Sequence, residues 1–359
     1  MDEHEEVAMD GHGGRRRTDA DEATRLAALV LAGLGVPEAD ATVQARHLVE
    51  ADMRGHASHG LRRMTVLAER IRVGLISPAA EPEFTWAASG ALVVDGRNGL
   101  GPVIAYRAMD LLAARAAETG VAIAAMHRTH HLGMLSPYVE KAAGEGLIAI
   151  VLTSTEGLVH PWGGAGALVG TNPLGAGIPA PDGDIILDMS TASVSAGKIL
   201  DYAARGEALP DGWAVDSAGR PTTDAAAAAH GAISPFGGAK GYALGVTLGA
   251  LVGALTGTAY GRDVHGTLDT TSSTTKGDIL MLIDPSVFGE APPSTALGDY
   301  VEQLRESGVD GAAVTVPGDR ARAARAAALR DGFDIGEDVW ATLEELAAQV
   351  GSRSEGPAA

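Results

Sequence analysis

The chain has 359 residues, 46% hydrophobic but only 4% aromatic, so aliphatic side chains and glycine must fill most of a sizeable core. Its 46 acidic and 27 basic residues leave a formal net charge of −19, which repels phosphate backbones and argues against nucleic-acid binding. The absence of cysteine excludes disulfides, thiolate catalysis, iron–sulfur clusters and zinc–thiolate sites, and is compatible with a reducing compartment.

Both ends of the chain are expected to lie outside the folded part. Residues 1–18 are acidic and polar where a secretory signal peptide is basic and then apolar, so they predict a disordered leader. Residues 351–359, which include RSEGPAA, predict a short tail. We therefore expect a cytoplasmic protein.

The first helical region extends from Asp21 to Met53 and is interrupted at 35–40, where the proline of GVPEAD favours the start of a second helix. A third helix is predicted from about Ser58 to Ile71, because apolar residues recur at the three- and four-residue spacing of one helix face. These apolar residues are Leu61, Met64, Ala68 and Ile71.

Alternating strands and helices follow, and their order predicts an α/β sheet. The expected elements are a strand and turn at 91–101, a helix at 103–118, a strand at 121–126, a loop at 127–133, a helix at 136–144 and a strand at 147–153. Later come a strand at 184–188, a helix from about Ala192, polar loops at 208–224 and 265–277, a strand at 278–283 and a helix at 320–330.

One charge-free run, 241–261, has the composition of a membrane segment. Its glycines recur every fourth residue from Gly241 to Gly257 and so line one helix face, a device for close helix approach. Because the run is solitary in an otherwise polar chain, we expect a buried core helix and no membrane partner.

The stretch 55-GHASHGLRRM-64 combines histidine with arginine. In a continuous helix, His59 and Arg63 form an i,i+4 pair, and Arg70 shares their face. A guanidinium fork suits the carboxylate of a 2-oxo or 2-hydroxy acid, and the imidazole could exchange a proton with the adjacent oxygen. Periodicity by itself favours the alternative, a solvated polar face.

A second histidine cluster, 127-HRTHHLG-133, brings the number of nearby histidines to five when 56-HASH-59 is included. A zinc site is an alternative, but the H-E-x-x-H pattern is absent and three convergent ligands are needed. His131 is expected near a helix N-terminus, where the dipole disfavours imidazolium and leaves a neutral base. A histidine that caps a turn is the other reading.

No nucleotide-binding fingerprint is present. The glycine-rich run 163-GGAGALVG-170 lacks the G-x-G-x-x-G spacing and does not lie between a strand and a helix, and no Walker A sequence occurs. A nucleotide enzyme with this sequence would hold its cofactor in another way.

Taken in order, several motifs resemble the malate/L-lactate dehydrogenase family, which includes ureidoglycolate, sulfolactate and diketogulonate dehydrogenases and cyclic-imine reductases. The resemblance covers about residues 20–350. It rests on 52-DMRGHASHGLRRM-64, 129-THHLG-133, 161-PWGG-164, 170-GTNPLGAGIP-179, 187-LDMSTASVSAGKI-199, 219-GRPTTD-224, 235-PFGGAKGYAL-244, 279-ILMLIDPSVF-288 and 316-VPGDR-320.

The resemblance implies an α/β fold that binds NAD or NADP without a Rossmann domain, through a mixed sheet accompanied by a mainly helical part for substrate binding and dimerisation. The implied division places the NAD(P)-binding domain at 121–289 and joins 19–120 to 290–350 in the helical part. A homodimer is expected.

Site residues follow by the same resemblance. His59 and His131 are the two candidates for proton transfer, Asp188 is a further catalytic candidate, and Ser58, Arg63 and His131 are expected to contact substrate. Lys240 also has its own rationale, since a cation in a glycine-rich loop that opens a helix favours a phosphate. The implied cofactor-binding residues are Thr155, Asp188, Met189, Ser190, Thr191, Lys240, Gly318, Asp319 and Arg320.

The expected activity is NAD(P)-dependent interconversion of a small 2-hydroxy acid and its 2-oxo acid, with a histidine acid–base, an arginine carboxylate grip and no metal. Reduction of a cyclic 2-imino acid is the first alternative, and a histidine-rich metal-dependent hydrolase is an alternative from another class. His130 stands where the family usually has asparagine, and Leu132 where it usually has phenylalanine. The first could alter hydrogen bonding and the second could enlarge the pocket.

Overall fold

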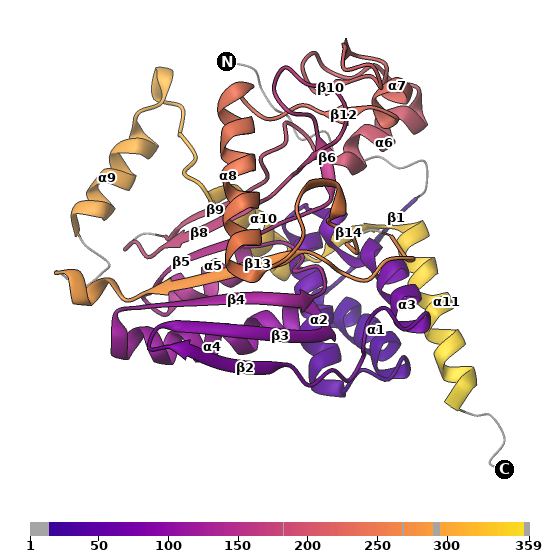
Figure 1. Ribbon diagram of the computed structural model, residues 1–359, viewed down its shortest axis with the longest axis horizontal. Helices are drawn as coiled ribbons and strands as arrows, with labels where there is room; N and C mark the ends of the chain where they lie inside the picture. The colour runs from indigo at the N-terminus through magenta and orange to yellow at the C-terminus, as the bar shows by residue number, and fades with distance from the viewer. Residues whose placement is uncertain (1–13, 182, 268, 290–294, 355–359) are drawn as a thin grey trace.

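A seven-stranded mixed sheet forms the centre of the protein in the computed structural model, which describes residues 14–181, 183–267, 269–289 and 295–354 (Figure 1). The strand order is β2-β3-β4-β13-β5-β8-β9, and only β3 and β4 are parallel neighbours. The strands are β2 Glu83–Ala88, β3 Ala91–Gly99, β4 Val121–Thr129, β5 Ile148–Thr153, β8 Leu174–Ile178, β9 Ile185–Met189 and β13 Gly277–Ile283.

Alternate residues of the central strands face two different helix layers. Ala122, Ala124 and Leu280 pack with α4 (Gly101–Thr119) and α5 (Ser136–Gly144) in one core. Ile123, Ala125 and Ile279 point the other way and pack against α8 (Ala239–Thr256). The two-residue period of a strand thus buries both sheet faces. Strands β2 and β3, which precede residue 120, belong to the same sheet as the strands that follow it, and α4 packs against that sheet.

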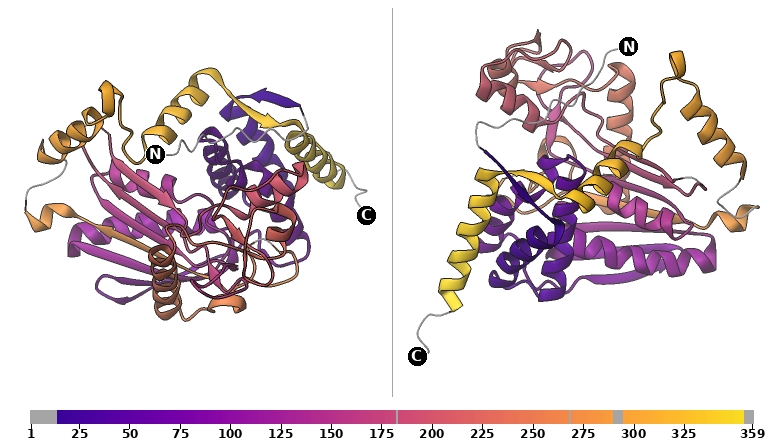
Figure 2. Two further views of the ribbon diagram at one scale, coloured as in Figure 1. Left: turned by 90° about the horizontal axis from the view of Figure 1, so that it is seen from above. Right: turned by 180° about the vertical axis from the view of Figure 1, so that it is seen from behind.

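A helical layer joins the two ends of the described chain (Figures 1 and 2). Its helices pack around one hydrophobic core, and a strand from each end pairs antiparallel, β1 with β14. The elements are β1 Arg15–Thr18, α1 Ala20–Gly33, α2 Glu38–Met53, α3 Met64–Arg72, α10 Asp319–Asp331, β14 Phe333–Gly336 and α11 Glu337–Ser354.

The predicted leader and tail are both too long. Residues 15–18 form β1, because each pairs with a residue of β14, and residues 351–354 continue α11. The rest of the expected leader and tail, 1–13 and 355–359, lies outside the described residues.

A smaller five-stranded sheet, ordered β11-β10-β12-β6-β7, lies at the top of Figure 1 with two helices. Its elements are β6 Gly157–Val159, β7 Val169–Gly170, α6 Ala196–Arg205, β10 Ala214–Val215, β11 Pro221–Thr222, α7 Ala225–Ala229 and β12 Ala232–Ile233. Helix α6 begins at Ala196, four residues later than predicted, because the Ser195 side chain accepts a hydrogen bond from the backbone N–H of Lys198 and caps the helix.

The glycine stripe of α8 is the face that packs on the protein. A Cβ on Gly245 would come within 2.7 Å of the Thr191 hydroxyl, and one on Gly249 within 2.6 Å of the Asn172 amide. The opposite face is exposed, with Val246, Leu251 and Leu255 more than 40% accessible. The predicted buried core helix is therefore buried along one face only. Among the described residues, α8 alone has the length and apolar composition of a membrane span.

Helix α9 (Thr295–Glu306) projects from the opposite side of the molecule to α11 (Figures 1 and 2). It buries only Gly298 and Val301, while Tyr300 and the preceding Phe288 are 54% and 73% exposed. This arm has few contacts with the rest of the chain.

Candidate active site

The histidine–arginine motif does not form the continuous helix that its periodicity predicts. Residues Ala57–His59 and Leu61–Arg63 are two single 3₁₀ turns, and α3 begins only at Met64. Gly60 separates the turns in an extended conformation, and a Cβ there would overlap the Asp52 carboxyl group. Asp52 Oδ2 also accepts the Leu61 backbone N–H at 2.7 Å. Asp52, near the end of α2, therefore stabilises the interruption between the two 3₁₀ turns.

His59 and Arg63 are consequently not an i,i+4 helical pair. Arg63 instead folds back so that its Nε donates to the Ser58 carbonyl oxygen at 2.6 Å. This bond fixes the guanidinium plane and leaves both terminal nitrogens available. No carboxylate of the described residues lies within ion-pair distance of Arg63.

The second histidine motif lies at the end of a central strand. Strand β4 continues to Thr129, three residues further than predicted, and His130 and His131 follow it directly. Thr129 Oγ1 donates to Asp278 on neighbouring β13 at 2.5 Å, and the buried Lys276 ammonium lies 2.5 Å from the same carboxylate. This buried ion pair, through its bond to Thr129, fixes the end of β4 that precedes His131.

The two predicted proton-transfer histidines are in contact with each other. The rings of His59 and His131 are stacked, with centroids 5.5 Å apart and planes inclined by 25°. His59 Nδ1 lies 3.0 Å from Ser58 Oγ, and His131 Nδ1 accepts the Gly133 backbone N–H at 3.1 Å. Residues 72 positions apart in the sequence therefore form one imidazole pair.

Both imidazoles are held neutral. Withdrawal from water, followed by the Arg63 charge, lowers the pKa of His59 to about 3 and the pKa of His131 well below its ordinary value. A neutral His131 was expected, but from the dipole of a following helix. That cause is wrong, because α5 begins only at Ser136 and its first amides are occupied by Asp188.

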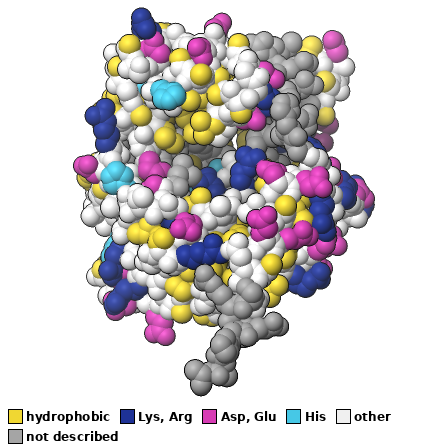
Figure 3. All heavy atoms as spheres, turned by 90° about the vertical axis from the view of Figure 1, so that its right-hand side faces the viewer, with side chains coloured by type: hydrophobic (Ala, Val, Ile, Leu, Met, Phe, Trp, Pro, Cys, Tyr) yellow, Lys and Arg dark blue, Asp and Glu magenta, His cyan; other side chains and the backbone are white. Residues whose placement is uncertain are grey.

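Arg63 and His131 line one cavity between the helical layer and the end of the central sheet. Figure 3 shows a hollow on the face at the right of Figure 1, with Lys or Arg and His side-chain atoms visible inside it. The residues around the cavity that carry polar side chains are Gln44, Arg63, Arg70, His130, His131 and Thr267. An arginine fork and a histidine thus face one space, which suits a small carboxylate.

The two departures from the family pattern behave differently. His130 lines the cavity, and its Nε2 bonds the Leu75 carbonyl oxygen at 2.8 Å. Leu132, in contrast, is buried in the core beneath the sheet and is absent from the cavity wall. The expectation that Leu132 enlarges the pocket is therefore wrong.

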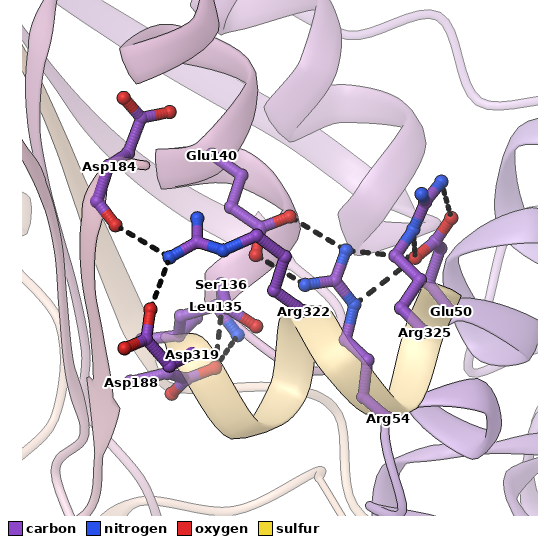
Figure 4. A network of polar contacts seen from close by, with 10 residues as sticks. All are labelled: Glu50, Arg54, Leu135, Ser136, Glu140, Asp184, Asp188, Asp319, Arg322 and Arg325. Atoms are coloured by element: carbon purple, nitrogen blue, oxygen red, sulfur yellow. Dashed lines mark hydrogen bonds and ion pairs between the residues drawn. The ribbon is translucent and has the colours of Figure 1, made fainter. Parts of the chain in front are cut away.

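Asp188 lies at the end of β9, as predicted, and points to the start of α5 (Figure 4). Its Oδ2 accepts the backbone N–H groups of Leu135 and Ser136, both at 2.7 Å. It therefore caps the helix that follows the His131 loop and contacts neither imidazole directly. Its geometry supports a positioning role.

Three threonine hydroxyl groups gather between the end of β7 and α8. Thr155 Oγ1 lies 3.1 Å from the Thr171 hydroxyl, and Thr191 donates from both its N–H and its hydroxyl to the Thr171 carbonyl oxygen. Asn172 links this group to α8, since it accepts the Thr155 N–H and donates to the Gly245 carbonyl oxygen. The sequence did not single out Asn172, although its Asn-Pro dipeptide signals a turn.

The remaining predicted cofactor residues are divided between two places. Lys240 is exposed at the start of α8, whose first amides have no side-chain cap. Gly318 opens α10 beside β9, where Ile186 N donates to the Pro317 carbonyl oxygen, and Figure 4 shows Asp319 bound to Arg322 of α10. Asp319 is bound by Arg305 and Arg322, while Arg320 is exposed.

Metal ligation has little support in this geometry. Within the described ranges, no group of three or more histidine and carboxylate side chains converges as a metal site. The histidines near the cavity are bonded instead to backbone groups or to a serine hydroxyl.

Comparisons with known proteins agree with the motifs. Residues 18–344 match the malate/L-lactate dehydrogenase family. The chain is 36% identical over 322 residues to a malate/(S)-sulfolactate dehydrogenase of Methanothermus fervidus, covering 89% of this chain and 94% of the relative. It is 34% identical over 320 residues to a Δ1-pyrroline-2-carboxylate reductase of Ancylobacter novellus, covering 89% and 93%.

The crystal structure of a dehydrogenase from Sinorhizobium meliloti is similar with a TM-score of 0.88 and 44% identity, covering 95% of this chain and all of that one. The expected mixed α/β fold and the resemblance drawn from the ordered motifs are thereby confirmed. The chain belongs to the malate/L-lactate dehydrogenase family of NAD(P)-dependent oxidoreductases.

Proposed function

We propose that this protein interconverts a small 2-hydroxy acid and the corresponding 2-oxo acid. In the oxidative direction the C2–H bond breaks and its electron pair leaves as hydride, the hydroxyl proton leaves to the protein, and the C2=O bond forms. The observation that carries the proposal is one cavity lined by Arg63 and His131, with the neutral imidazole of His59 stacked on that of His131. Bound NAD or NADP supplies the hydride acceptor.

Arg63 is proposed to hold the substrate carboxylate. Its Nε is committed to Ser58, so both terminal nitrogens can bind two carboxylate oxygens in parallel. This grip places C2 and its oxygen next to the histidines, the positioning that lowers the entropic part of the barrier.

The hydrogen bonds of the two rings favour His59 as the proton carrier. Because His131 Nδ1 accepts a backbone N–H, a neutral His131 carries its own proton on Nε2 and is a donor there. His59 can instead donate from Nδ1 to Ser58 Oγ, which leaves Nε2 free to accept a proton. We assign proton transfer to His59 and polarisation of the C2 oxygen to His131.

Two variants test this assignment. His59→Gln removes the base and is expected to lower kcat by about 10²–10⁴-fold. His131→Gln keeps an N–H donor and is expected to lower kcat by only about tenfold. The measurement is kcat as a function of pH for both variants. A larger loss of kcat in His131→Gln than in His59→Gln would make His131 the proton carrier.

For the cofactor, the structure offers a fitting set of groups. The uncapped amides of the α8 start, beside exposed Lys240, suit a diphosphate, and the Thr155 and Thr191 hydroxyls are of the kind that bind ribose or phosphate oxygens. Met189, Ser190 and the segment Gly318–Arg320 are further proposed contacts. Asp319 is the weakest of them, because two arginines already bind it.

The activity is tested by following nicotinamide absorbance with a set of 2-oxo acids against NADH and NADPH. Cyclic 2-imino acids belong in the same set, because the relative in Ancylobacter novellus is a Δ1-pyrroline-2-carboxylate reductase and the carboxylate grip would be shared. Reduction of imines but of no 2-oxo acid would replace the proposal with this rival. Loss of all activity in excess EDTA would favour a metal-dependent enzyme instead.

We also propose that the protein is a cytoplasmic homodimer. The exposed stripe of α8, which contains Val246, Leu251 and Leu255, and the projecting α9 arm supply apolar surface that a second copy could cover. Sedimentation velocity is expected to show a dimer. The Leu251→Glu variant is expected to dissociate more readily into monomers. The division into a 121–289 cofactor domain and a helical part for substrate and dimer contacts stays part of this proposal.

A further inference from the structure

One peptide group joins His131 to a buried tyrosine that the proposed reaction does not use. The N–H of the peptide between Leu132 and Gly133 donates to His131 Nδ1 at 3.1 Å. The carbonyl oxygen of the same peptide accepts the Tyr138 hydroxyl at 2.5 Å. The two ends of a planar trans peptide point in opposite directions, so the hydroxyl and the imidazole hold one rigid unit from its two sides. The Tyr138 hydroxyl therefore helps to set the direction of the N–H that reaches His131.

Gly133 is the residue that would allow this peptide to turn over. Its φ is +77°, and glycine is also at ease at negative φ, so the peptide before it can rotate at little steric cost. After half a turn the Leu132 carbonyl oxygen would face His131 Nδ1. A carbonyl oxygen can only accept, so the proton of a neutral His131 would then lie on Nδ1 and not on Nε2.

The ends of the loop that carries His131 are fixed by other groups. Thr129, which precedes the loop, donates to Asp278, and the first N–H groups of α5 donate to Asp188. These bonds hold the two ends, and none of them is made to the Leu132–Gly133 peptide. The orientation of this peptide depends on what contacts it directly.

Tyr138 is placed so that it remains a donor in one direction. It is 0% exposed, and burial raises the pKa of its hydroxyl well above the ordinary value, so the hydroxyl keeps its proton. Its ring is held by two others, His47 and Tyr106, each with its centroid 4.8 Å away. The His47 ring also lies against the loop, because a Cβ on Gly133 would come within 2.5 Å of its Nε2. The hydroxyl direction thus follows from ring packing.

We propose that Tyr138 is a positioning residue that acts through the Leu132–Gly133 peptide and keeps the His131 proton on Nε2. This inference rests on the proposed function, in which His131 donates from Nε2 to the C2 oxygen. Tyr138 does not line the cavity, so it acts on the substrate only through His131. A hydrogen bond to the carbonyl oxygen also strengthens the N–H of the same amide as a donor, which favours the same tautomer.

The kinetic test removes the hydroxyl and keeps the ring. Tyr138→Phe is expected to lower kcat by about 3–10-fold and to change both Michaelis constants by less than about twofold. Tyr106→Phe is the matched control, because its hydroxyl lies on the neighbouring ring and is bonded to His47 Nδ1 at 3.3 Å. This control should leave kcat unchanged within about twofold.

A double variant separates this role from a purely structural one. In a His131→Ala background no imidazole remains to be oriented, so adding Tyr138→Phe should not lower the residual kcat further. If Tyr138 only stabilised the fold, the same factor would be lost in both backgrounds. Replacement of Tyr138 by p-aminophenylalanine keeps an N–H donor at this place and should restore kcat to within about twofold of the wild type.

The tautomer itself is measured without activity, by NMR of the protein labelled with 15N-histidine. The wild-type His131 signals, identified by their loss in His131→Gln, should show Nε2 protonated and Nδ1 unprotonated. Tyr138→Phe should move the proton toward Nδ1, and Tyr106→Phe should not. An unchanged tautomer or an unchanged kcat in Tyr138→Phe would overturn the inference, as would a wild-type His131 protonated on Nδ1. The expected tautomers in a protein that reduces no 2-oxo acid would overturn the proposed function instead.

Discussion

Arg54 and Arg70 are both buried, at 5% and 1% exposed, yet their guanidinium groups are satisfied in opposite ways. Arg54 lies between two carboxylates, with Glu50 at 2.9 Å and Glu140 at 2.7 Å, and Arg325 completes the group from α10 (Figure 4). Arg70 bonds only backbone carbonyl oxygens and retains an unpaired N–H.

The difference separates an arginine whose charge is fully paired within the protein from one whose charge is not. Burial lowers the pKa of Arg54, but hydrogen bonds to Glu140 and Glu50 more than compensate and raise it, so the network is complete without a ligand. Burial lowers the pKa of Arg70 and of Arg63, and the nearby acids do not restore it. A buried cation that the chain leaves incomplete is where an anionic substrate gains most.

The largest expected effect belongs to the complete network. Arg54→Met leaves Glu140 without its partner and removes one of two from Glu50, and should lower the free energy of unfolding by about 3–5 kcal/mol. The substrate KM should stay unchanged, because no bond of Arg54 reaches the cavity wall. Urea unfolding and steady-state kinetics on the same preparation provide the two measurements.

A matched control is the half-exposed pair of Arg107 with Asp40, 2.6 Å apart. Arg107→Gln should cost less than about 1 kcal/mol, because an exposed ion pair is screened by water. A rise in the substrate KM with Arg54→Met would contradict the comparison, because it would mean that Arg54 also affects substrate binding.

The second prediction concerns pH. Burial lowers the pKa of His47 to about 4 and of His130 to about 3, and both side chains are almost fully enclosed. Each takes up a proton near pH 6.5 only after unfolding. The stability is thus greatest above pH 6.5 and falls as the pH is lowered, by about 1 kcal/mol per histidine between pH 6.5 and 5.5.

Other groups modify this slope. His59 and His131 act in the same direction, while Asp52, whose pKa burial raises to about 7, takes up its proton in the folded state and opposes them. We expect a net loss of roughly 2–3 kcal/mol over that pH unit. Urea midpoints measured across the range should show it, and His130→Asn should flatten the slope by about one proton. An unchanged slope in this variant would mean that His130 titrates in the folded state.

How much of the fold the sequence predicts depends on whether a feature is set by neighbouring residues or by distant ones. Local patterns were sufficient for α5, predicted at Ser136–Gly144 as observed, because a strong apolar period and an early Pro137 mark its start. They could not place β13 between β4 and β5, since that position depends on pairing across more than 120 residues.

The residues of the candidate site also differ in how far the sequence identifies them. His59, Arg63 and His131 stood out because their residue types and motif order are unusual. Gln44 did not, because a glutamine on an amphipathic helix has the appearance of a solvated residue until its burial is known. The break at Gly60 was missed for a related reason, since the Asp52 carboxyl group that occupies the space lies on another helix.

The smallest of the three predicted effects concerns Arg63, a partly buried arginine without a carboxylate partner among the described residues. Arg63→Lys replaces a fixed fork with a flexible point charge and also removes the Nε bond to Ser58. The KM for a 2-oxo acid should rise by about 10–100-fold, equivalent to roughly 1.4–2.7 kcal/mol, while the cofactor KM and the free energy of unfolding change little. The protein would then be expected to lose substrate affinity without losing stability, the reverse of Arg54→Met. Equal increases in both Michaelis constants would mean that Arg63 shapes the whole site, and the substrate carboxylate would need another partner.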